Sequence, residues 1–357
     1  MSARLLISGA GTPACNNLVQ SLRAGDPSLR IAAFHSDRFV LRRSDADRRH
    51  LVPVSSHAAY LGALRRIVET ERADLLIPTS DGDVRALSRL RVKIPCPLFI
   101  PRHATIEVCQ DKYELSILLR KRGIPAPLTY AVTDLARLGG LFRRLPARPR
   151  VWCRMRTGSG SMGAIPVTKP EQARGWIRHW QAMRRVPANA FTLSEYLPGR
   201  DFGCQSLWKD GTLILIKTYE RLSYLGMGGN PGQVSSVATL AKTVREPRVV
   251  DICARAVRAL DPRASGVFSI DLKENADAVP CITDVNVGRF SSATAVYDQT
   301  GKHNMAITYV RLALGEPVDL REEYDVDEDH YVLRDVDMPP AVFHADDFFD
   351  GIEEARA

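Results

Sequence analysis

The stretch Phe268–Ser292 reads F-S-I-D-L-K-E-N-A-D-A-V-P-C-I-T-D-V-N-V-G-R-F-S-S, and it decides how the rest of the chain is interpreted. Two apolar runs, Gly266–Leu272 and Val279–Val287, flank the polar connector Lys273–Ala278. This pattern predicts a β-hairpin, because each run has the length and residue types of a strand and the connector has those of a turn.

Each apolar run carries one carboxylate, Asp271 in the first and Asp284 in the second, and Asn286 lies two residues after Asp284. Side chains two residues apart on a strand share a face. If the hairpin places Asp271 on that face, three oxygen ligands of the kind preferred by Mg²⁺ or Mn²⁺ converge. A surface hairpin with solvated acids is the simpler alternative. It explains Asp277, but it does not explain acids embedded among Ile, Leu and Val, since buried acids need a partner.

Length and charge narrow the class of protein. A chain of 357 residues is too long for one ordinary core, so two or three domains are expected. The net charge is +8, and most of the excess is arginine. The arginines are scattered and no nucleic-acid-binding motif accompanies them. We therefore expect anionic small-molecule substrates and no nucleic-acid partner.

The cysteines and the apolar runs indicate the compartment. The seven cysteines form no C-x-x-C pair and most lie in apolar runs, as is typical of core residues in a reducing cytosol. The N-terminus, MSARLLISGAG, is too short and too rich in glycine for a signal peptide, and no apolar run has membrane-spanning length. These features predict a cytoplasmic protein without a membrane partner.

The N-terminal part shows the β-α-β pattern of a doubly wound parallel sheet, with strands at Leu5–Ser8 and Arg30–Phe34 around a helix that begins at Pro13. Residues 9–14, G-A-G-T-P-A, formally match the dinucleotide fingerprint G-x-G-x-x-A, although Asp37 fits its acidic position only loosely. A tight turn without a nucleotide is favoured, and an NAD(P)-dependent dehydrogenase stays open as a remote alternative.

A second feature of this part is Thr79–Asp83, which follows the predicted strand Leu75–Pro78. The carboxyl edge of a parallel sheet is where ligands bind, but Ser and Asp are also common helix caps. Both interpretations stay open. Pro95, Pro97 and Pro101 mark a domain boundary near residue 102.

The middle of the chain carries two features suited to phosphate. Asp111-Lys112 opens a helix, and the strand Val151–Met155 carries Arg154 among apolar residues. The loop Thr157–Gly163 follows that strand, and its glycines let backbone amides approach phosphate oxygens closely. A plain hairpin turn is the alternative, and the loop is no P-loop because no Gly-Lys-Ser/Thr closes it.

The segments that follow are strands, a glycine-rich connection and a tail. Glu220–Val237 is rich in glycine, which indicates a functional lid or disorder, and Lys217 and Arg221 lie beside it. After Asp319 the acids and aromatic residues crowd together. This tail is an extra lobe, a dimer contact or a partly disordered segment, so a homodimer stays open.

Taken together, these motifs resemble those of the ATP-grasp superfamily, in the branch similar to the large subunit of carbamoyl-phosphate synthase. The resemblance runs in order over roughly residues 4–318. It implies an α/β and α+β fold. A Rossmann-like pre-ATP-grasp domain at residues 1–102 would precede a two-lobed ATP-grasp domain at 103–318, with the small lobe at about 128–196 and the acidic, aromatic tail at 319–357.

The resemblance also implies roles for individual residues. Phosphates of ATP would contact Lys112, Arg154, Gly158, Ser159, Gly160 and Ser161. Adenine and ribose would contact Glu195, Tyr196, Leu197 and Asp201. Mg²⁺ or Mn²⁺ would be held by Asp271, Asp284 and Asn286. Catalysis would rest on Arg289, Lys112 and Arg154, and Lys217, Arg221 and Arg289 are candidates for substrate binding.

The implied activity is that of an ADP-forming carboxylate–amine ligase that makes an amide or peptide bond through an acyl phosphate. Three departures from the family pattern bear on the metal and ribose sites. Asp284 stands where Glu is usual, Asp201 is also shorter than the usual Glu, and one extra residue separates Asn286 from Arg289. Phosphorylation of bicarbonate or carbamate, as in carbamoyl-phosphate synthase, stays open, and so does a non-catalytic ATP-binding sensor.

Overall fold

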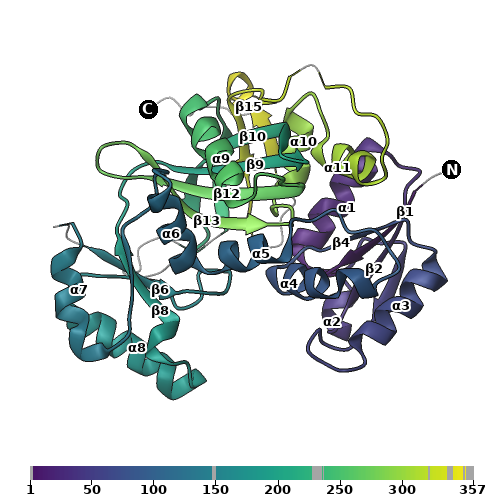
Figure 1. Cartoon of the computed structure of the whole chain (residues 1–357). Helices are drawn as coiled ribbons and strands as arrows, with labels where there is room; N and C mark the ends of the chain where they lie inside the picture. Colours follow the sequence, from purple (N-terminus) through teal and green to yellow (C-terminus); the bar gives the residue numbers. More distant parts are fainter. Residues whose placement is uncertain are drawn as a thin grey trace, which may run out of the picture.

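The computed structural model describes residues 3–146, 150–226, 235, 237–320, 322–335, 341–348 and 350, and it contains three β-sheets. Figure 1 shows the N-terminal sheet at one side of the molecule, a seven-stranded sheet in the middle, and a second four-stranded sheet at the other side. Within the described residues, no helix has both the length and the apolar character needed to cross a membrane.

The N-terminal sheet is parallel throughout and has the order β3-β2-β1-β4. Its strands are β1 (Arg4–Ser8), β2 (Arg30–His35), β3 (Arg48–Leu51) and β4 (Leu75–Ile77), and its helices are α1 (Pro13–Gly25), α2 (Arg38–Leu41), α3 (Tyr60–Glu71) and α4 (Asp81–Leu90). This arrangement confirms the predicted Rossmann-like pattern. Ser80 caps α4, since its hydroxyl accepts a hydrogen bond from the backbone N–H of Asp83.

The glycine turn after β1 is filled by the protein's own chain. Gly11 has a φ of +80°, and a Cβ placed there would lie 1.8 Å from the carbonyl oxygen of Val40 in α2. A Cβ at Gly9 would lie 2.3 Å from Oγ1 of Thr79. Both glycines are therefore explained by close packing against α2 and the end of β4, as the tight-turn interpretation expects. The turn contributes no residue to the cavity described below.

The second four-stranded sheet is antiparallel and carries two helices. Its order is β5-β8-β6-β7, with β5 at Thr129–Ala131, β8 at Phe191–Glu195, β6 at Val151–Met155 and β7 at Ile165–Val167. Its helices are α7 (Leu138–Arg144) and α8 (Pro170–Arg184). Cys153, Ile177 and Phe191 are fully buried in the core that these elements share. We call this unit the small lobe.

The central sheet has the order β13-β12-β9-β10-β11-β14-β15. Its strands are β9 (Asp201–Lys209), β10 (Thr212–Tyr224), β11 (Ala238–Thr243), β12 (Gly266–Glu274), β13 (Pro280–Val287), β14 (His330–Leu333) and β15 (Ala341–His344). The predicted hairpin at Phe268–Ser292 is therefore present as β12 and β13. The predicted glycine-rich lid starts later than expected, because β10 continues to Tyr224, and residues 227–234 and 236 lie outside the described residues.

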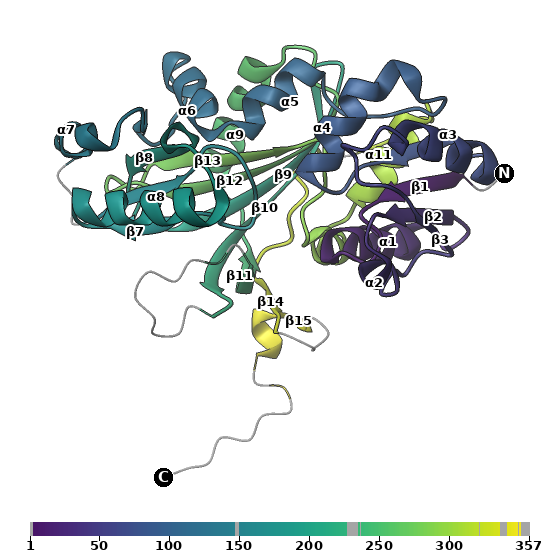
Figure 2. The same ribbon diagram turned by 90° about the horizontal axis from the view of Figure 1, so that it is seen from below.

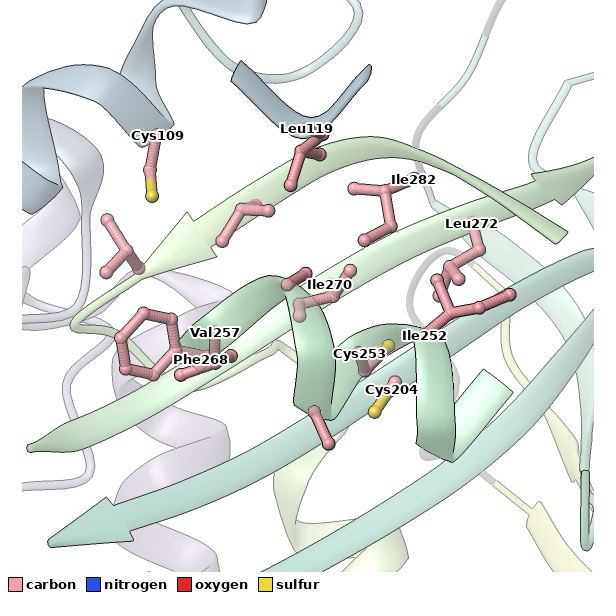
Figure 3. Close-up of a cluster of buried hydrophobic side chains, with 14 of the residues drawn as sticks. Cys109, Leu119, Cys204, Ile252, Cys253, Val257, Phe268, Ile270, Leu272 and Ile282 are labelled. Atoms are coloured by element: carbon pink, nitrogen blue, oxygen red, sulfur yellow. The ribbon is translucent and has the colours of Figure 1, made fainter. Parts of the chain in front are cut away.

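One face of the central sheet is covered by helices. Helices α5 (His103–Gln110), α6 (Lys112–Lys121) and α9 (Pro247–Leu260) pack on it, and Figure 3 shows Ile252 and Val257 of α9 in one cluster with Ile270 of β12. Alternate residues of β12 point to the opposite face. Asp271 therefore lies on the face that these helices leave uncovered.

The C-terminal segment extends the central sheet. β11 pairs with β14 and β14 pairs with β15, and Figure 2 shows these two strands continuing the sheet beyond β11. Helices α10 (Thr294–Thr300) and α11 (Met305–Ala313) precede them, and α11 packs against α1 of the N-terminal part and β9 of the central sheet. The described part of the tail is thus an edge of the central sheet, which none of the three interpretations of the tail anticipated.

Candidate active site

The three predicted metal ligands lie together on the uncovered face of the β12–β13 hairpin. Asp271 is the register partner of Asp284, so their side chains share a face, and Asn286 lies one pleat further along. Nδ2 of Asn286 donates a hydrogen bond to Oδ2 of Asp271 at 3.1 Å. The predicted convergence of the three side chains is therefore present. Their role as metal ligands stays a prediction.

These residues open onto a cavity of about 920 Å³ between the central sheet and the small lobe. This volume is near the upper end of the range of about 300–1,000 Å³ that is typical of small-molecule sites. Cationic side chains outnumber carboxylates in its lining, which suits a polyanionic occupant. The described cations are Lys112, Arg150, Arg154, Arg221, Lys273, Arg289 and Arg334, and the carboxylates are Glu195, Asp201, Asp271 and Asp284.

Arg154 extends from β6 of the small lobe toward the hairpin. Its Nη2 donates to the carbonyl oxygen of Thr283 at 2.8 Å, and its buried Nε has no hydrogen-bond partner in the described part of the chain. Burial lowers the pKa of Arg154, while Asp284 and Asp271 act to raise it. Arg154 lines the cavity, and its guanidinium remains charged at neutral pH, which suits an anionic occupant.

Lys112 connects the glycine loop with the hairpin. Asp111 caps α6 by accepting hydrogen bonds from the backbone N–H groups of Tyr113 and Glu114, and this fixes Lys112 at the first position of the helix. Nζ of Lys112 donates to the carbonyl oxygen of Gly158 at 2.8 Å and lies 3.3 Å from Oδ2 of Asp284.

The predicted phosphate loop lines the cavity with backbone in unusual conformations. Gly158, Gly160 and Gly163 have φ values of +107°, +67° and +68°, and Ser161 has +57°. Only Gly163 is packed, since a Cβ there would lie 2.7 Å from Cγ of Met155. Ser159 also lines the cavity. Gly158, Ser159, Gly160 and Ser161 line the same cavity as Lys112 and Arg154, which places a loop of little side-chain bulk where phosphate binding is predicted.

The connection from the end of β8 to the start of β9 joins the two lobes at the cavity wall. Glu195, Tyr196, Leu197 and Asp201 all line the cavity. Oε2 of Glu195 accepts a hydrogen bond from the backbone N–H of Leu128 at 3.3 Å, and Leu197 is buried. These are the residues predicted to contact adenine and ribose, and the structure places them beside one another without testing that role.

Arg289 is held by two partners from distant parts of the chain. Its Nε lies 2.5 Å from Oδ1 of Asp81, and its Nη2 donates to Oδ1 of Asn286 at 2.5 Å. Asp81 is the first residue of α4, inside the Thr79–Asp83 stretch whose role the sequence left open. That stretch thus both caps a helix and orients a cation of the cavity.

Lys217 does not line the cavity, which corrects its assignment as a substrate-binding residue. Its Nζ is buried, donates to the carbonyl oxygens of Tyr297 and His303 at 2.9 and 2.6 Å, and lies 3.3 and 3.2 Å from carboxylate oxygens of Asp298 and Asp325. An ammonium with four oxygen neighbours has no free donor for a substrate.

Arg221 lines the cavity but is engaged by carboxylates. Its Nη1 donates to Oδ1 of Asp201 at 3.0 Å, and its Nη2 contacts Oδ1 of Asp271 and the hydroxyl of Tyr219. Burial acts to lower the pKa of Arg221, but the neighbouring carboxylates outweigh it and hold that pKa well above its ordinary value. Arg221 is therefore a structural counter-ion of the hairpin carboxylates in this conformation.

Several cavity residues were not predicted from the sequence. Tyr219 of β10 and Tyr297 of α10 stack with ring centroids 4.4 Å apart, and Val332 and Arg334 reach the cavity from the C-terminal segment. No local motif marks these residues, because they meet only through the pairing of β11 with β14 and the packing of α10.

The donor set fits a hard divalent cation. In the described part of the chain no three His, Cys, Asp or Glu side chains form a cluster that could hold a metal ion. Asp271, Asp284 and Asn286 supply two carboxylates and one amide oxygen. Such a set is typical of Mg²⁺, which keeps several waters and binds substrate phosphates.

No known family model matches this chain. The structure is similar to that of an L-amino acid ligase from Bacillus licheniformis, with 14% identity, a TM-score of 0.69, and coverage of 93% of this chain and 79% of that one. It is also similar to an N5-carboxyaminoimidazole synthase from Aspergillus clavatus in complex with ADP and 5-aminoimidazole ribonucleotide, with 15% identity, a TM-score of 0.69, and coverage of 93% and 82%. A biotin carboxylase from Campylobacter jejuni matches with 13% identity, a TM-score of 0.70, and coverage of 93% and 75%. At these identities the likeness shows the fold, and the chain has the ATP-grasp fold that its motifs predict.

Proposed function

We propose that this chain is an ATP-dependent, ADP-forming carboxylate–amine ligase. One observation carries the proposal: the Asp271–Asp284–Asn286 face of the central sheet lines the same cavity as Lys112, Arg154 and the glycine loop. Carboxylates and cations that line one cavity suit a nucleotide triphosphate with its metal. The neighbours crystallised with ATP or ADP support the nucleotide part of this proposal.

The residues would act by positioning and by charge. Lys112, Arg154 and the loop amides would bind the triphosphate. The base and ribose would be held by residues between the end of β8 and the start of β9. A bound Mg²⁺ on Asp271, Asp284 and Asn286 would neutralise charge on the terminal phosphates. Arg289, oriented by Asp81, would stabilise the charge that develops on the transferred phosphoryl group.

The chemistry has two steps. A carboxylate oxygen of the first substrate attacks the γ-phosphorus of ATP, and the bond to the β–γ bridging oxygen breaks to release ADP. The amine of the second substrate then attacks the acyl carbon, inorganic phosphate leaves with the electron pair of the C–O bond, and the nitrogen loses a proton. Neither step needs a covalent bond to the protein, so positioning and charge stabilisation supply the rate.

The same geometry accommodates two further candidates. Phosphorylation of bicarbonate uses the same carboxylate attack on ATP, and a sensor would bind ATP without turnover. We propose that residues 103–318 form the ATP-grasp unit and residues 1–102 the preceding domain, acting on small molecules in the cytoplasm. The partners would be a carboxylate and an amine, and a homodimer remains open.

The proposal is tested by ADP release. The full chain with Mg-ATP is assayed against pooled amino acids and other carboxylates, with Asp284→Ala and the surface variant Lys121→Ala alongside. We expect turnover that requires one pool, disappears in Asp284→Ala and persists in Lys121→Ala. Turnover with bicarbonate alone would favour the carbamoyl-phosphate alternative, ATP binding without turnover would favour a sensor, and absence of ATP binding would refute the proposal.

A further inference from the structure

The part of the cavity beneath β10, β11 and β14 has an apolar wall. Tyr219, Ala241, Ala293 and Tyr297 pack together and are each at most 9% exposed, yet all four line the cavity. Val332, the register partner of Ala241, continues this wall and is also buried. We call these five residues the apolar wall. The two alanines keep it recessed, because larger side chains there would extend into the cavity.

The position of the Tyr219 ring in this wall depends on a glycine on the neighbouring strand. A Cβ at Gly203 would lie 2.0 Å from Cζ of Tyr219, so only glycine lets the Tyr219 ring lie across β9. The Tyr219 hydroxyl is already engaged by Nη2 of Arg221 at 2.9 Å. The stacked rings of Tyr219 and Tyr297 add aromatic surface to this part of the cavity, which suits an apolar group.

One cation borders the apolar wall. Arg334 directly follows β14, and its backbone N–H donates to the carbonyl oxygen of Thr239 at 2.8 Å, so its side chain shares the face of Val332. Lys112, Arg221 and Arg289 each pair with a carboxylate, whereas no carboxylate in the described ranges pairs with the Arg334 guanidinium. Arg334 is thus a cation of the cavity lining with its bidentate donors available to an anion.

The spacing across the sheet limits the size of the occupant. Val332, Ala241 and Arg221 are successive register partners on β14, β11 and β10. Neighbouring strands are about 4.8 Å apart, so roughly 10 Å separates the Val332 row from the Arg221 row beside the hairpin carboxylates. The hairpin strand β12 lies two strands beyond β10, so the Arg334 side chain, the bound molecule and the acyl phosphate together span roughly 19 Å from the Val332 row to the Asp271 row.

We infer that this region is the subsite of the amine substrate, and that this substrate is an amino acid with an apolar side chain. Its carboxylate binds Arg334, its side chain packs against the apolar wall, and its amine faces the hairpin where the acyl phosphate forms. This inference rests on the proposed function and deepens it, because it assigns specificity to the C-terminal strands.

The test measures binding to the full chain by thermal shift, with Mg²⁺ and the non-hydrolysable analogue AMP-PNP present throughout. The probes are L-alanine, L-leucine, L-methionine and L-phenylalanine, each beside its amide, which keeps the amine and side chain but lacks the carboxylate. We expect at least one of the larger amino acids to raise Tm in a concentration-dependent way, and its amide to bind at least tenfold more weakly.

Two variants make the assignment specific. Arg334→Gln should weaken binding of that amino acid at least tenfold and leave the AMP-PNP shift unchanged, while the exposed control Arg178→Gln changes neither. Ala241→Val should weaken the larger amino acids more than L-alanine, since it fills the recess. Each variant is used only if AMP-PNP raises its Tm by the same amount as it raises that of the original chain. This condition shows that the variant is folded and still binds the nucleotide.

Four results would overturn the inference: no Tm shift with any of the four amino acids, equal binding of the amides, unchanged binding in Arg334→Gln, or an Ala241→Val variant that weakens all four equally. Failure of the proposed function looks different, because the AMP-PNP shift itself would then be absent.

Discussion

Nζ of Lys112 lies 3.3 Å from Oδ2 of Asp284, and this pair joins the first turn of α6 to the β13 strand across the cavity. The same ammonium donates to the carbonyl oxygen of Gly158 in the glycine loop. One side chain thus links a hairpin carboxylate with the loop above it. A triphosphate that enters with a divalent cation would separate the pair, giving Lys112 a phosphate partner and Asp284 a metal partner.

The first prediction concerns this pair. Lys112→Met should lower ADP release at least about 100-fold, because a cation placed at developing phosphate charge contributes on that order. Steady-state kinetics with the substrates found in the pooled assay measure the effect. Lys121→Met, on the exposed end of the same helix, is the matched control and should retain full activity. Equal activity of both variants would contradict a phosphate role for Lys112.

The second prediction concerns the unused donor of Arg154. Arg154→Met should weaken nucleotide binding at least tenfold, and Arg154→Lys should recover only part of it, because lysine keeps the charge but lacks the planar set of donors. Titration of each variant with Mg-AMP-PNP by calorimetry measures the affinity. Arg178→Met, exposed on α8 of the same lobe, controls for loss of charge. If Arg154→Lys binds the nucleotide as tightly as the original chain, the planar set of guanidinium donors is not needed for binding.

The third prediction separates packing from backbone strain in the glycine loop. Gly163→Ala and Gly160→Ala both place a side chain at a φ near +68°, since the two values are +68° and +67°. Only the first also crowds Met155, because a Cβ at Gly160 has no atom within 4 Å. Gly163→Ala should therefore lower the free energy of unfolding by about 1–3 kcal/mol more than Gly160→Ala. Urea denaturation of the two variants measures this difference. Equal midpoints would show that packing against Met155 adds no destabilisation to the backbone strain.

The fourth prediction is a pH dependence at Asp325. Burial acts to raise the pKa of Asp325, but the Lys217 ammonium and the backbone N–H groups of residues 302 and 303 outweigh it, so that pKa lies below its ordinary value. A lowered folded-state pKa means that the ionised group stabilises the protein above the unfolded value of about 3.9, and that this contribution is lost as pH falls through the folded value.

Asp325→Asn should accordingly destabilise the chain at pH 7 by about 3–5 kcal/mol, since it leaves part of the buried Lys217 charge uncompensated. The difference between the variant and the original chain should shrink below pH 4. Denaturant midpoints measured from pH 7 to pH 3 give both curves. A difference that stays constant over that range would show that Asp325 contributes packing and not charge.

The fifth prediction concerns the thiols. All seven cysteines are buried, and burial raises the pKa of Cys281 to about 11 and those of Cys15, Cys96 and Cys153 to about 12. Each of these four groups is protonated at pH 7, and the thiolate is the reactive form. Ellman's reagent should therefore label fewer than one thiol per folded chain and all seven after denaturation. Rapid labelling of the folded chain would contradict this burial.

The sequence predicted the parts of the fold that local patterns specify. The hairpin around Phe268–Ser292 was predicted because two apolar runs and a polar connector lie within one short stretch, and its pairing places Asp271 opposite Asp284. The helix that starts at Lys112 was predicted for a similar reason, since Asp111 is a local capping signal.

The features that escaped prediction depend on distant pairing. Arg334 reaches the cavity because β14 pairs with β11, and nothing in the local sequence marks that pairing. Asp81 contacts Arg289 from another part of the chain. Lys217 was misassigned because its carboxylate partners, Asp298 and Asp325, come from separate later segments, so its sequence surroundings show a cation without a counter-charge.

The buried Lys217 ammonium has a consequence for how the chain matures. Its partner Asp298 also accepts a hydrogen bond from Ser21 of α1, a residue 277 positions earlier. During synthesis, α1 and β10 are therefore made long before Asp298, whose carboxylate pairs with Lys217 of β10 and accepts the hydrogen bond from Ser21 of α1. Contacts between residues so far apart in the sequence form slowly, because the entropy of loop closure is lost before the contact stabilises the chain. We expect nascent or truncated chains that end before Asp298 to expose this region and to depend on chaperones until the later segment arrives.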